Sequence, residues 1–378
     1  MSFSRNTYPI GVDLADQYVY AAQFKKNANG PVIRGLYDRM LDKGLFEWTA
    51  DDPDLDAEFS GQLTAIFKEI RTSDDFADRR IVLKLPAHLL FTFPVTFELE
   101  EEATVEAAIV RECRRYLSFP LEEAVIDYPG IDRMADGDTP RYRASIIAVR
   151  RDQVEKYLSL ASSAGLVVEA IDYGMAALFR LHHHLYPIKP KPMILCNLGY
   201  RQSLLAIVTA DNILAQRAVT WGFHDIAERI RSNFELPAAS GSLAGLIRTC
   251  GLRYETGRHG QDAPGDNSSD TSMGDMDVHR TVYQVLAPYV DELIHELHQI
   301  IAYVRSETRH TAFESIALYG QGSDVHHLDQ YLESRLGIPT RCINPMTKIS
   351  AGEKSVDSSG AANYAIALGL GLRQVKWL

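Results

Sequence analysis

Two segments in different halves of the chain follow the same order of short apolar runs, and this repeat restricts the fold more than any other feature. The first covers residues 8–40 and the second residues 193–221. Each opens with an apolar strand that ends at a carboxylate or an amide, Asp13 or Asn197, and continues through Gly or Ala into further strands. Two β-meanders with helices between them predict an internally duplicated α/β protein with two lobes.

Between the repeats, residues 79–170 are expected to form a compact insertion of the strand–helix–strand–strand type. A helix at 54–72, with apolar residues on one face, precedes it. The elements expected in the insertion are strand 80–86, an extended segment at 87–97, a helix that starts in the acidic run 98–102 and continues through 103–117, strands 124–128 and 142–149, and helix 151–164.

The second half of the chain contains a polar segment, residues 255–277, which is rich in Gly, Asp, Ser and Asn and predicts a mobile loop. The elements expected after it are helix 279–306, strand 315–319, helix 324–336, a short strand at 340–343 and helix 361–372. The domains expected are a first lobe of residues 1–78 with 171–190 and 350–378, an inserted subdomain of residues 79–170, and a second lobe of residues 191–349.

Composition excludes several classes of protein. The 378 residues carry a formal net charge of −11, so there is no excess of Lys and Arg for a protein that coats nucleic acid. Four cysteines lie far apart, and the N-terminus has no signal-peptide pattern, which indicates a reduced, cytoplasmic protein. No apolar run reaches about 18 residues, so we expect no membrane span.

Short motifs occur in a fixed order along nearly the whole chain. They are Ile10–Asp13, Tyr116–Glu123, Ala164–Asp172, Asn197–Gly199, Leu336–Pro339, Asn344–Pro345 and Tyr364–Arg373. Each is weak alone, but the ordered set resembles the PilM family of type IV pilus assembly proteins and, more distantly, the cell-division protein FtsA. The resemblance implies an actin-like fold, in which the insertion corresponds to the small subdomain that distinguishes PilM and FtsA from actin.

The resemblance also implies a nucleotide cleft between the lobes, bordered by three loops. In the first loop Asp13 keeps the acidic position of the family. Ala15, however, stands where Gly is expected, and Asp16 stands where a hydroxyl group is expected. A carboxylate directed at a phosphate position is repulsive. The first loop therefore argues against tight phosphate binding.

The other two loops are altered as well. In the second loop Asn197 replaces the usual Asp and would coordinate Mg²⁺ less well, although Gly199 is kept. The third loop has Gly320 and Gly322 with Gln321 between them. We therefore expect a degenerate cleft in which nucleotide binding is weak or lost, and no enzyme activity. Bound ATP with slow or absent hydrolysis is the alternative.

For a partner, the resemblance implies the short cytoplasmic N-terminal tail of the inner-membrane protein PilN, taken as an extended peptide in a groove between the small subdomain and the first lobe. The residues expected to line this groove are Phe91, Phe93, Tyr116, Phe119 and Leu121. Core packing is the alternative explanation for them. The protein would then be a cytoplasmic adaptor at the inner-membrane platform, with the pilus motor ATPases as further partners.

Two other functions remain open at this point. One is an ATP-dependent kinase or filament-forming protein of the actin-like superfamily. The other is the cytoplasmic component of a type II secretion platform, which we rank lower because such chains normally continue into a membrane helix. His182–His184 are expected on a solvated helix surface, and not at a metal site, because consecutive helical side chains point in different directions.

Overall fold

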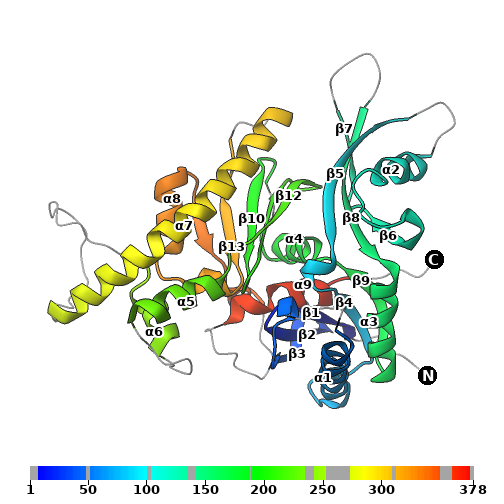
Figure 1. Ribbon diagram of the computed structural model, residues 1–378, viewed down its shortest axis with the longest axis horizontal. Coiled ribbons are helices and arrows are strands. Elements are labelled where there is room, and N and C mark those ends of the chain that lie inside the picture. Colours follow the sequence, from blue (N-terminus) through cyan, green and yellow to red (C-terminus); the bar gives the residue numbers. More distant parts are fainter. Residues whose placement is uncertain are drawn as a thin grey trace.

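Two five-stranded sheets form the two lobes of the protein in the computed structural model (Figure 1). The structure describes residues 7–47, 52–99, 104–134, 141–187, 189–234, 242–252, 273–308, 312–349 and 360–374. The first sheet contains β1 (Thr7–Leu14), β2 (Tyr18–Asn27), β3 (Gly30–Met40), β4 (Arg80–Lys84) and β9 (Val167–Asp172). The second contains β10 (Met193–Leu198), β11 (Ser203–Val208), β12 (Ile213–Val219), β13 (Ile316–Tyr319) and β14 (Thr340–Cys342).

The two sheets have the same topology. Their strand orders are β3-β2-β1-β4-β9 and β12-β11-β10-β13-β14. The first strand of each sheet pairs antiparallel with the second and parallel with the fourth, as β1 does with β2 and β4, and β10 with β11 and β13. The internal duplication predicted from the repeated apolar runs is therefore confirmed.

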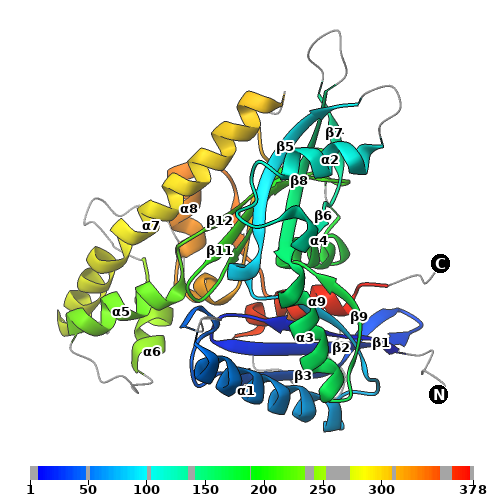
Figure 2. The same ribbon diagram turned by 45° about the vertical axis from the view of Figure 1, so that its right-hand side comes forward.

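Helices cover both faces of the first sheet (Figure 2). On the outer face lie α1 (Pro53–Thr72) and α3 (Arg151–Ser163), whose apolar residues share one core with β1 and β4. On the inner face lie α4 (Gly174–Leu185) and α9 (Ala365–Gly371), which share a second core with strands of both sheets. The two lobes are thus joined through a layer of buried helices.

The inner helices pack so closely that their backbone atoms contact each other and the backbone of the first sheet. A Cβ atom placed on Gly11 of β1 would lie 2.0 Å from the carbonyl oxygen of Ala367 in α9. A Cβ atom on Gly369 of α9 would lie 1.9 Å from the carbonyl oxygen of Ala177 in α4. Because only glycine lacks this atom, β1, α9 and α4 can stack this closely only with glycine at these two positions.

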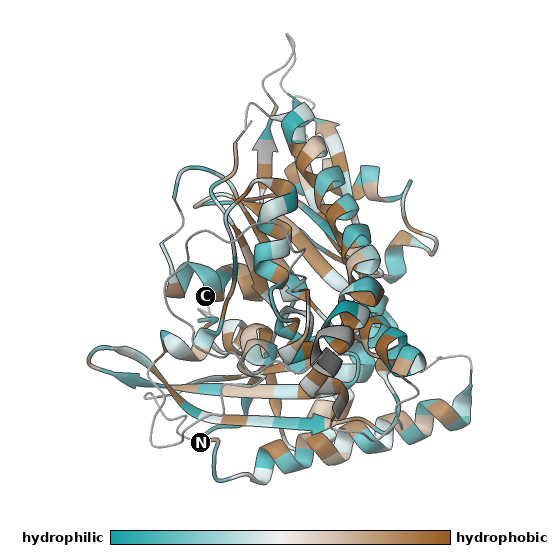
Figure 3. Cartoon of the chain, turned by 90° about the vertical axis from the view of Figure 1, so that its left-hand side faces the viewer, coloured by the Kyte–Doolittle hydropathy of each residue, from teal (hydrophilic) through white to brown (hydrophobic). Residues whose placement is uncertain are grey.

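In the second lobe, α5 (Phe223–Phe234), α6 (Ser242–Thr249), α7 (Met273–Glu307) and α8 (Leu328–Leu336) pack around one apolar core with their sheet. Figure 3 shows the outer helices striped in both colours, as expected for helices with one buried face. Helices α5 and α6 were not predicted from the sequence. Within the described ranges, no helix is both long and apolar enough to cross a bilayer.

The insertion has a sheet of its own, with the order β5-β8-β6 and with β7 paired to β8. Its elements are β5 (Phe91–Glu98), α2 (Val105–Cys113), β6 (Ala124–Asp127), β7 (Ile131–Arg133) and β8 (Arg141–Arg150). Strands β4 and β9, which lie at the ends of the expected range 79–170, pair within the first sheet. The inserted sheet therefore spans a narrower range, 91–150.

Several element boundaries differ from the sequence prediction. Glu98 ends β5, and the side chain of Thr104 caps the start of α2, so the helix does not begin at Glu98. Residues 255–272 of the expected loop lie outside the described residues, but 273–277 open α7. The expected helix 324–336 is divided, because His327 has a left-handed φ of 60° immediately before α8.

His182 is buried between the lobes, which corrects its predicted position on a solvated surface. Its side chain is 5% exposed, and its Nδ1 lies 2.7 Å from the hydroxyl of Tyr319 at the end of β13. Burial, and to a smaller degree the charge of His183, lowers the pKa of His182 to about 4. His183 and His184 are exposed, as expected.

The buried histidine predicts a specific loss of stability in acid. The unfolded chain binds the proton with an ordinary pKa of 6.5, whereas the folded protein binds it near pH 4. Stability is therefore lost as the pH falls from about 6.5 to about 4, and at pH 5 this group costs about 2 kcal/mol. We expect His182→Gln to lose less stability than the wild type between pH 7 and pH 5 in urea unfolding. The exposed His183→Gln is the control, and equal pH dependence of His182→Gln and the wild type would contradict this assignment.

Candidate functional site

Asp13, the acidic residue of the first loop, is held by a lysine of its own lobe. Lys84 is the last residue of β4 and pairs in register with Asp13 of β1. Its Nζ donates to Oδ1 of Asp13 at 2.8 Å and to the carbonyl oxygen of Leu14 at 3.0 Å. Asp13 and Lys84 are only 3% and 4% exposed, so the carboxylate already has a buried cation. The sequence signal for this role was a lysine inside the apolar run Ile81–Leu85.

Asp16 is held by an arginine from the other lobe. Arg201 lies in the turn between β10 and β11, and its Nε is 3.3 Å from Oδ2 of Asp16. Its Nη2 donates to Oε1 of Glu47 at 2.8 Å. The side chain of Asp16 is 5% exposed and that of Arg201 is 31% exposed. This ion pair, which crosses from one lobe to the other, was not predicted from the sequence.

The glycines of the second and third loops approach protein atoms closely. Gly320 has a φ of 82°, and a Cβ atom there would lie 2.5 Å from the carbonyl oxygen of Leu198 and 2.9 Å from Oδ1 of Asn197. Gly199 and Gly322 are equally confined, with protein atoms 2.3 Å and 2.8 Å from an added Cβ. These glycines let the loops pack closely against each other, so protein atoms occupy the space beside them.

The structure places part of the predicted cleft around one small cavity. The predicted residues that line it are Asp13, Ala15, Asp16, Asn197 and Gly199, whereas Gly320 and Gly322 do not line it. The cavity has a volume of about 60 Å³, whereas ligand pockets usually measure roughly 300–1,000 Å³. Since its carboxylates are already paired with Lys84 and Arg201, the residues present do not fit a nucleotide.

A much larger groove, with a volume of about 1,110 Å³, lies where the insertion meets the first lobe. It is bordered by β9, α3, α4, β6 and β8, and Figures 1 and 2 place β6, β9 and the end of α9 on the same side of the molecule. The apolar residues that line it include Leu85, Leu90, Val125, Val149, Leu158 and Phe179. β9 and β6 are each the last strand of their sheet along this groove.

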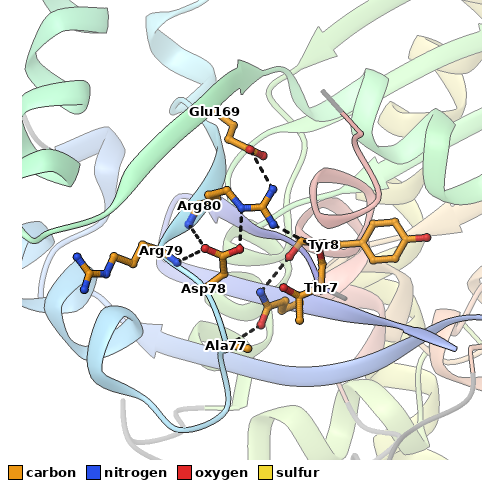
Figure 4. A network of polar contacts seen from close by, with 8 residues as sticks. Thr7, Tyr8, Ala77, Asp78, Arg79, Arg80 and Glu169 are labelled. Atoms are coloured by element: carbon orange, nitrogen blue, oxygen red, sulfur yellow. Dashed lines mark hydrogen bonds and ion pairs between the residues drawn. The ribbon is translucent and has the colours of Figure 1, made fainter. Parts of the chain in front are cut away.

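Two of the carboxylates in this groove are neutralised by arginines. Glu169 accepts from Arg80 at 3.0 Å, and Arg80 also binds Asp78 at 2.6 Å and the carbonyl oxygen of Thr7 (Figure 4). Asp172 forms ion pairs at 2.9 Å with both Arg180 and Arg373. These pairs attach β9 to β4 and to the C-terminal segment.

Other polar groups of the groove have no such partner. Asp127 and Asp211 are exposed and form no ion pair within the described residues. The hydroxyl of Tyr173 is buried and has no hydrogen-bond partner among the residues that the structure describes. Burial raises the pKa of Tyr173, as do the charges of Asp172 and Asp127, so the hydroxyl keeps its proton. In the described part of the chain, the groove therefore offers two carboxylates without a cation and one donor without an acceptor.

None of the five residues predicted to line the groove does so. They are Phe91, Phe93, Tyr116, Phe119 and Leu121, and they lie on the side of the inserted sheet that α2 covers. Phe91 contacts Phe119 edge to face, and Phe93 stacks on Tyr116 with ring centroids 4.8 Å apart. The reason is the two-residue period of a strand, which directs alternate residues of β5 to the face that bears Val95.

Residues 11–255 and 277–375 match the protein family described as type IV pilus assembly protein PilM. The two ranges contain most of the chain. The chain belongs to this family. The resemblance inferred from the ordered motifs is therefore confirmed.

Solved structures agree with this assignment. The PilM-PilN type IV pilus biogenesis complex matches with a TM-score of 0.72 at 21% identity, covering 97% of this chain and 98% of that chain. The ethanolamine utilization protein EutJ from Carboxydothermus hydrogenoformans matches with a TM-score of 0.53 at 9% identity, covering 97% and 89%. Both likenesses establish the fold, which is actin-like as expected. MreB5 of Spiroplasma citri bound to AMPPNP has a TM-score of 0.48 at 12% identity, covering 97% of this chain and 95% of that chain.

The buried pair in the first loop of this PilM-family member makes a prediction about stability. Lys84→Met leaves the carboxylate of Asp13 buried without a cation and should lower the free energy of unfolding by about 3–5 kcal/mol. The double variant Asp13→Asn with Lys84→Met removes both charges and should recover most of that loss. Urea unfolding measures both changes. As a control, Lys43→Met disrupts an exposed pair with Glu58 and should have little effect. A double variant as unstable as Lys84→Met would contradict the assignment.

Proposed function

We propose that this protein is an adaptor in type IV pilus assembly, which binds the cytoplasmic N-terminal tail of a PilN-like membrane protein in the groove between the insertion and the first lobe. The observation that carries the proposal is a large groove with apolar walls, bordered by the edge strands of two sheets. The protein would then act in the cytoplasm, at the inner membrane, through its partner.

The edge strands suit an extended peptide. In the sheets of the described chain, β9 pairs only with β4, and β6 pairs only with β8. A strand with a partner on one side has backbone groups that can pair with a peptide on the other. Since a strand rises about 3.3 Å per residue, the six residues of β9 match a tail segment of about 20 Å. The hydroxyl of Tyr173 is a further donor for a peptide carbonyl group.

The charge of the groove suits the same occupant. Glu169 and Asp172 are neutralised by arginines, but Asp127 and Asp211 are not. Cytoplasmic segments close to a membrane helix are enriched in Lys and Arg. We therefore propose that these two carboxylates attract basic residues of the tail, while apolar residues of the tail occupy the walls of the groove.

Nucleotide has no necessary part in this proposal. The cavity between the phosphate loops is small and its carboxylates are paired internally, which supports weak or absent nucleotide binding. An ATP-binding, filament-forming or kinase-like protein is the alternative function. Calorimetry with ATP and Mg²⁺ distinguishes them, because tight Mg²⁺-dependent binding together with turnover would favour the alternative.

A matched pair of variants tests the groove. Leu158 of α3 lines the groove and is 37% exposed, whereas Val110 of α2 lies outside it and is 39% exposed. Leu158→Arg places a cation in the groove and removes an apolar contact, so we expect the affinity for the tail peptide to fall by about tenfold or more. Val110→Arg should leave it unchanged. The measurement is calorimetry with N-terminal tail peptides of the pilus-type membrane proteins of the same genome.

Two outcomes would contradict the proposal. One is no binding of any such tail by the wild-type protein. The other is a loss of affinity in Tyr116→Ala, on the opposite side of the inserted sheet, without a loss in Leu158→Arg. That second outcome would instead favour the aromatic surface of Phe91, Phe93, Tyr116 and Phe119. Asp127→Asn with Asp211→Asn should also weaken binding and reduce its dependence on salt.

A further inference from the structure

We propose that Arg201 is an internal clasp that holds the two lobes closed at the place where the phosphate loops of the fold meet. The lobes would then be held together by side chains of the protein itself, without a bound nucleotide. This inference goes beyond the adaptor function, because Arg201 does not line the tail groove.

The clasp links two turns that are duplicates of each other. Asp16 lies in the turn between β1 and β2 of the first lobe, and Arg201 lies in the turn between β10 and β11 of the second. Each turn follows the strand that pairs with the same two neighbours in its sheet. The ion pair between Nε of Arg201 and Oδ2 of Asp16, at 3.3 Å, thus joins the equivalent turns of the two lobes.

Arg201 holds the first lobe at two points that belong to one unit. Its second contact is Glu47, at 2.8 Å. The segment that leads to Glu47 is attached to the turn of Asp16, because the backbone N–H of Leu45 donates to the carbonyl oxygen of Asp16 at 2.8 Å and Nε2 of Gln17 donates to the carbonyl oxygen of Leu41 at 3.0 Å. An arginine suits this geometry because its planar charged group donates to Glu47 through Nη2 while its Nε faces the carboxylate of Asp16 as an ion pair.

The charges around the cavity leave no cation for a phosphate group. The charged side chains that line it are Asp13, Asp16, Lys84 and Arg201, which sum to zero. His88 lines it too, but burial, and then the charge of Lys84, lowers the pKa of His88 to about 4, so it is neutral at pH 7. A nucleotide would have to displace a buried carboxylate from its cation, which is costly.

The alternative is that Arg201 and Asp16 form a surface ion pair that does not stabilise the closed state, since exposed ion pairs contribute little to stability. The burial of Asp16 argues against it, because removing the cation leaves a carboxylate that is 5% exposed without its ion-pair partner. The side chain of Asp16 also packs against Gly44, where an added Cβ atom would lie 3.1 Å from its Oδ1.

Hydrogen exchange of the two turns tests the clasp. We expect Arg201→Gln to raise amide exchange by about tenfold or more both in residues 13–17 and in residues 199–203, since both turns open when the clasp is lost. The double variant Asp16→Asn with Arg201→Gln should show the same rise without a buried unpaired charge, so it remains informative if the single variant folds poorly. Arg335→Gln is the control, because Arg335 pairs at 3.0 Å with Asp291 inside the second lobe.

Further measurements separate this proposal from the adaptor function. In the wild type, ATP with Mg²⁺ should leave the exchange of both turns unchanged, and protection of the turns by ATP would overturn the clasp as a substitute for nucleotide. Exchange that rises only in the second-lobe turn of Arg201→Gln, or in neither turn, would also overturn it. The affinity of Arg201→Gln for the tail peptide should stay within about threefold of that of the wild type. The two proposals can therefore fail separately. Unchanged exchange in Arg201→Gln would overturn the clasp but not the adaptor function, and absence of tail binding would overturn the adaptor function but not the clasp.

Discussion

The backbone contact of β1, α9 and α4 is the constraint on which the rest of the structure depends. Gly11 and Gly369 allow these elements to stack at a distance that any side chain would prevent. The resulting layer of helices shares its core with both sheets, so it determines how the two lobes face each other. It also places the end of β1, with Asp13, on one side and α4, which borders the large groove, on another.

Charge pairing at the phosphate loops is the feature of this fold that argues against a bound nucleotide. Every carboxylate at the small cavity meets a cation of the protein, Lys84 for Asp13 and Arg201 for Asp16. A buried charge that has a partner is tolerated, whereas an unpaired one is strongly destabilising. The same chemistry acts in the groove, where Arg80, Arg180 and Arg373 neutralise Glu169 and Asp172. Asp127 and Asp211 are left for the proposed basic tail.

The small cavity and the large groove are connected at the ends of the paired strands β4 and β9. Lys84 and Asp172 are register neighbours at the ends of β4 and β9. Lys84 is directed to the first loop, and Asp172 is directed to the arginines of the groove. The small cavity and the large groove are therefore built on adjacent strands, although different side chains line them.

The sequence by itself determined the duplicated two-lobed fold and the presence of an insertion, because apolar periodicity and turn residues act over short stretches of chain. The family was indicated by the resemblance of the ordered motifs to those of PilM. The sequence also indicated that Asp16 and Asn197 disturb the phosphate loops. It did not determine which side chains meet. Lys84 lies 71 positions from Asp13, and Arg201 lies 154 positions from Glu47, so only the folded chain brings them together. The face to which β5 directs its aromatic residues, and the burial of His182, were likewise decided by the packing of α2 and of the second lobe. Local patterns specify elements, whereas contacts between distant residues depend on how those elements pack.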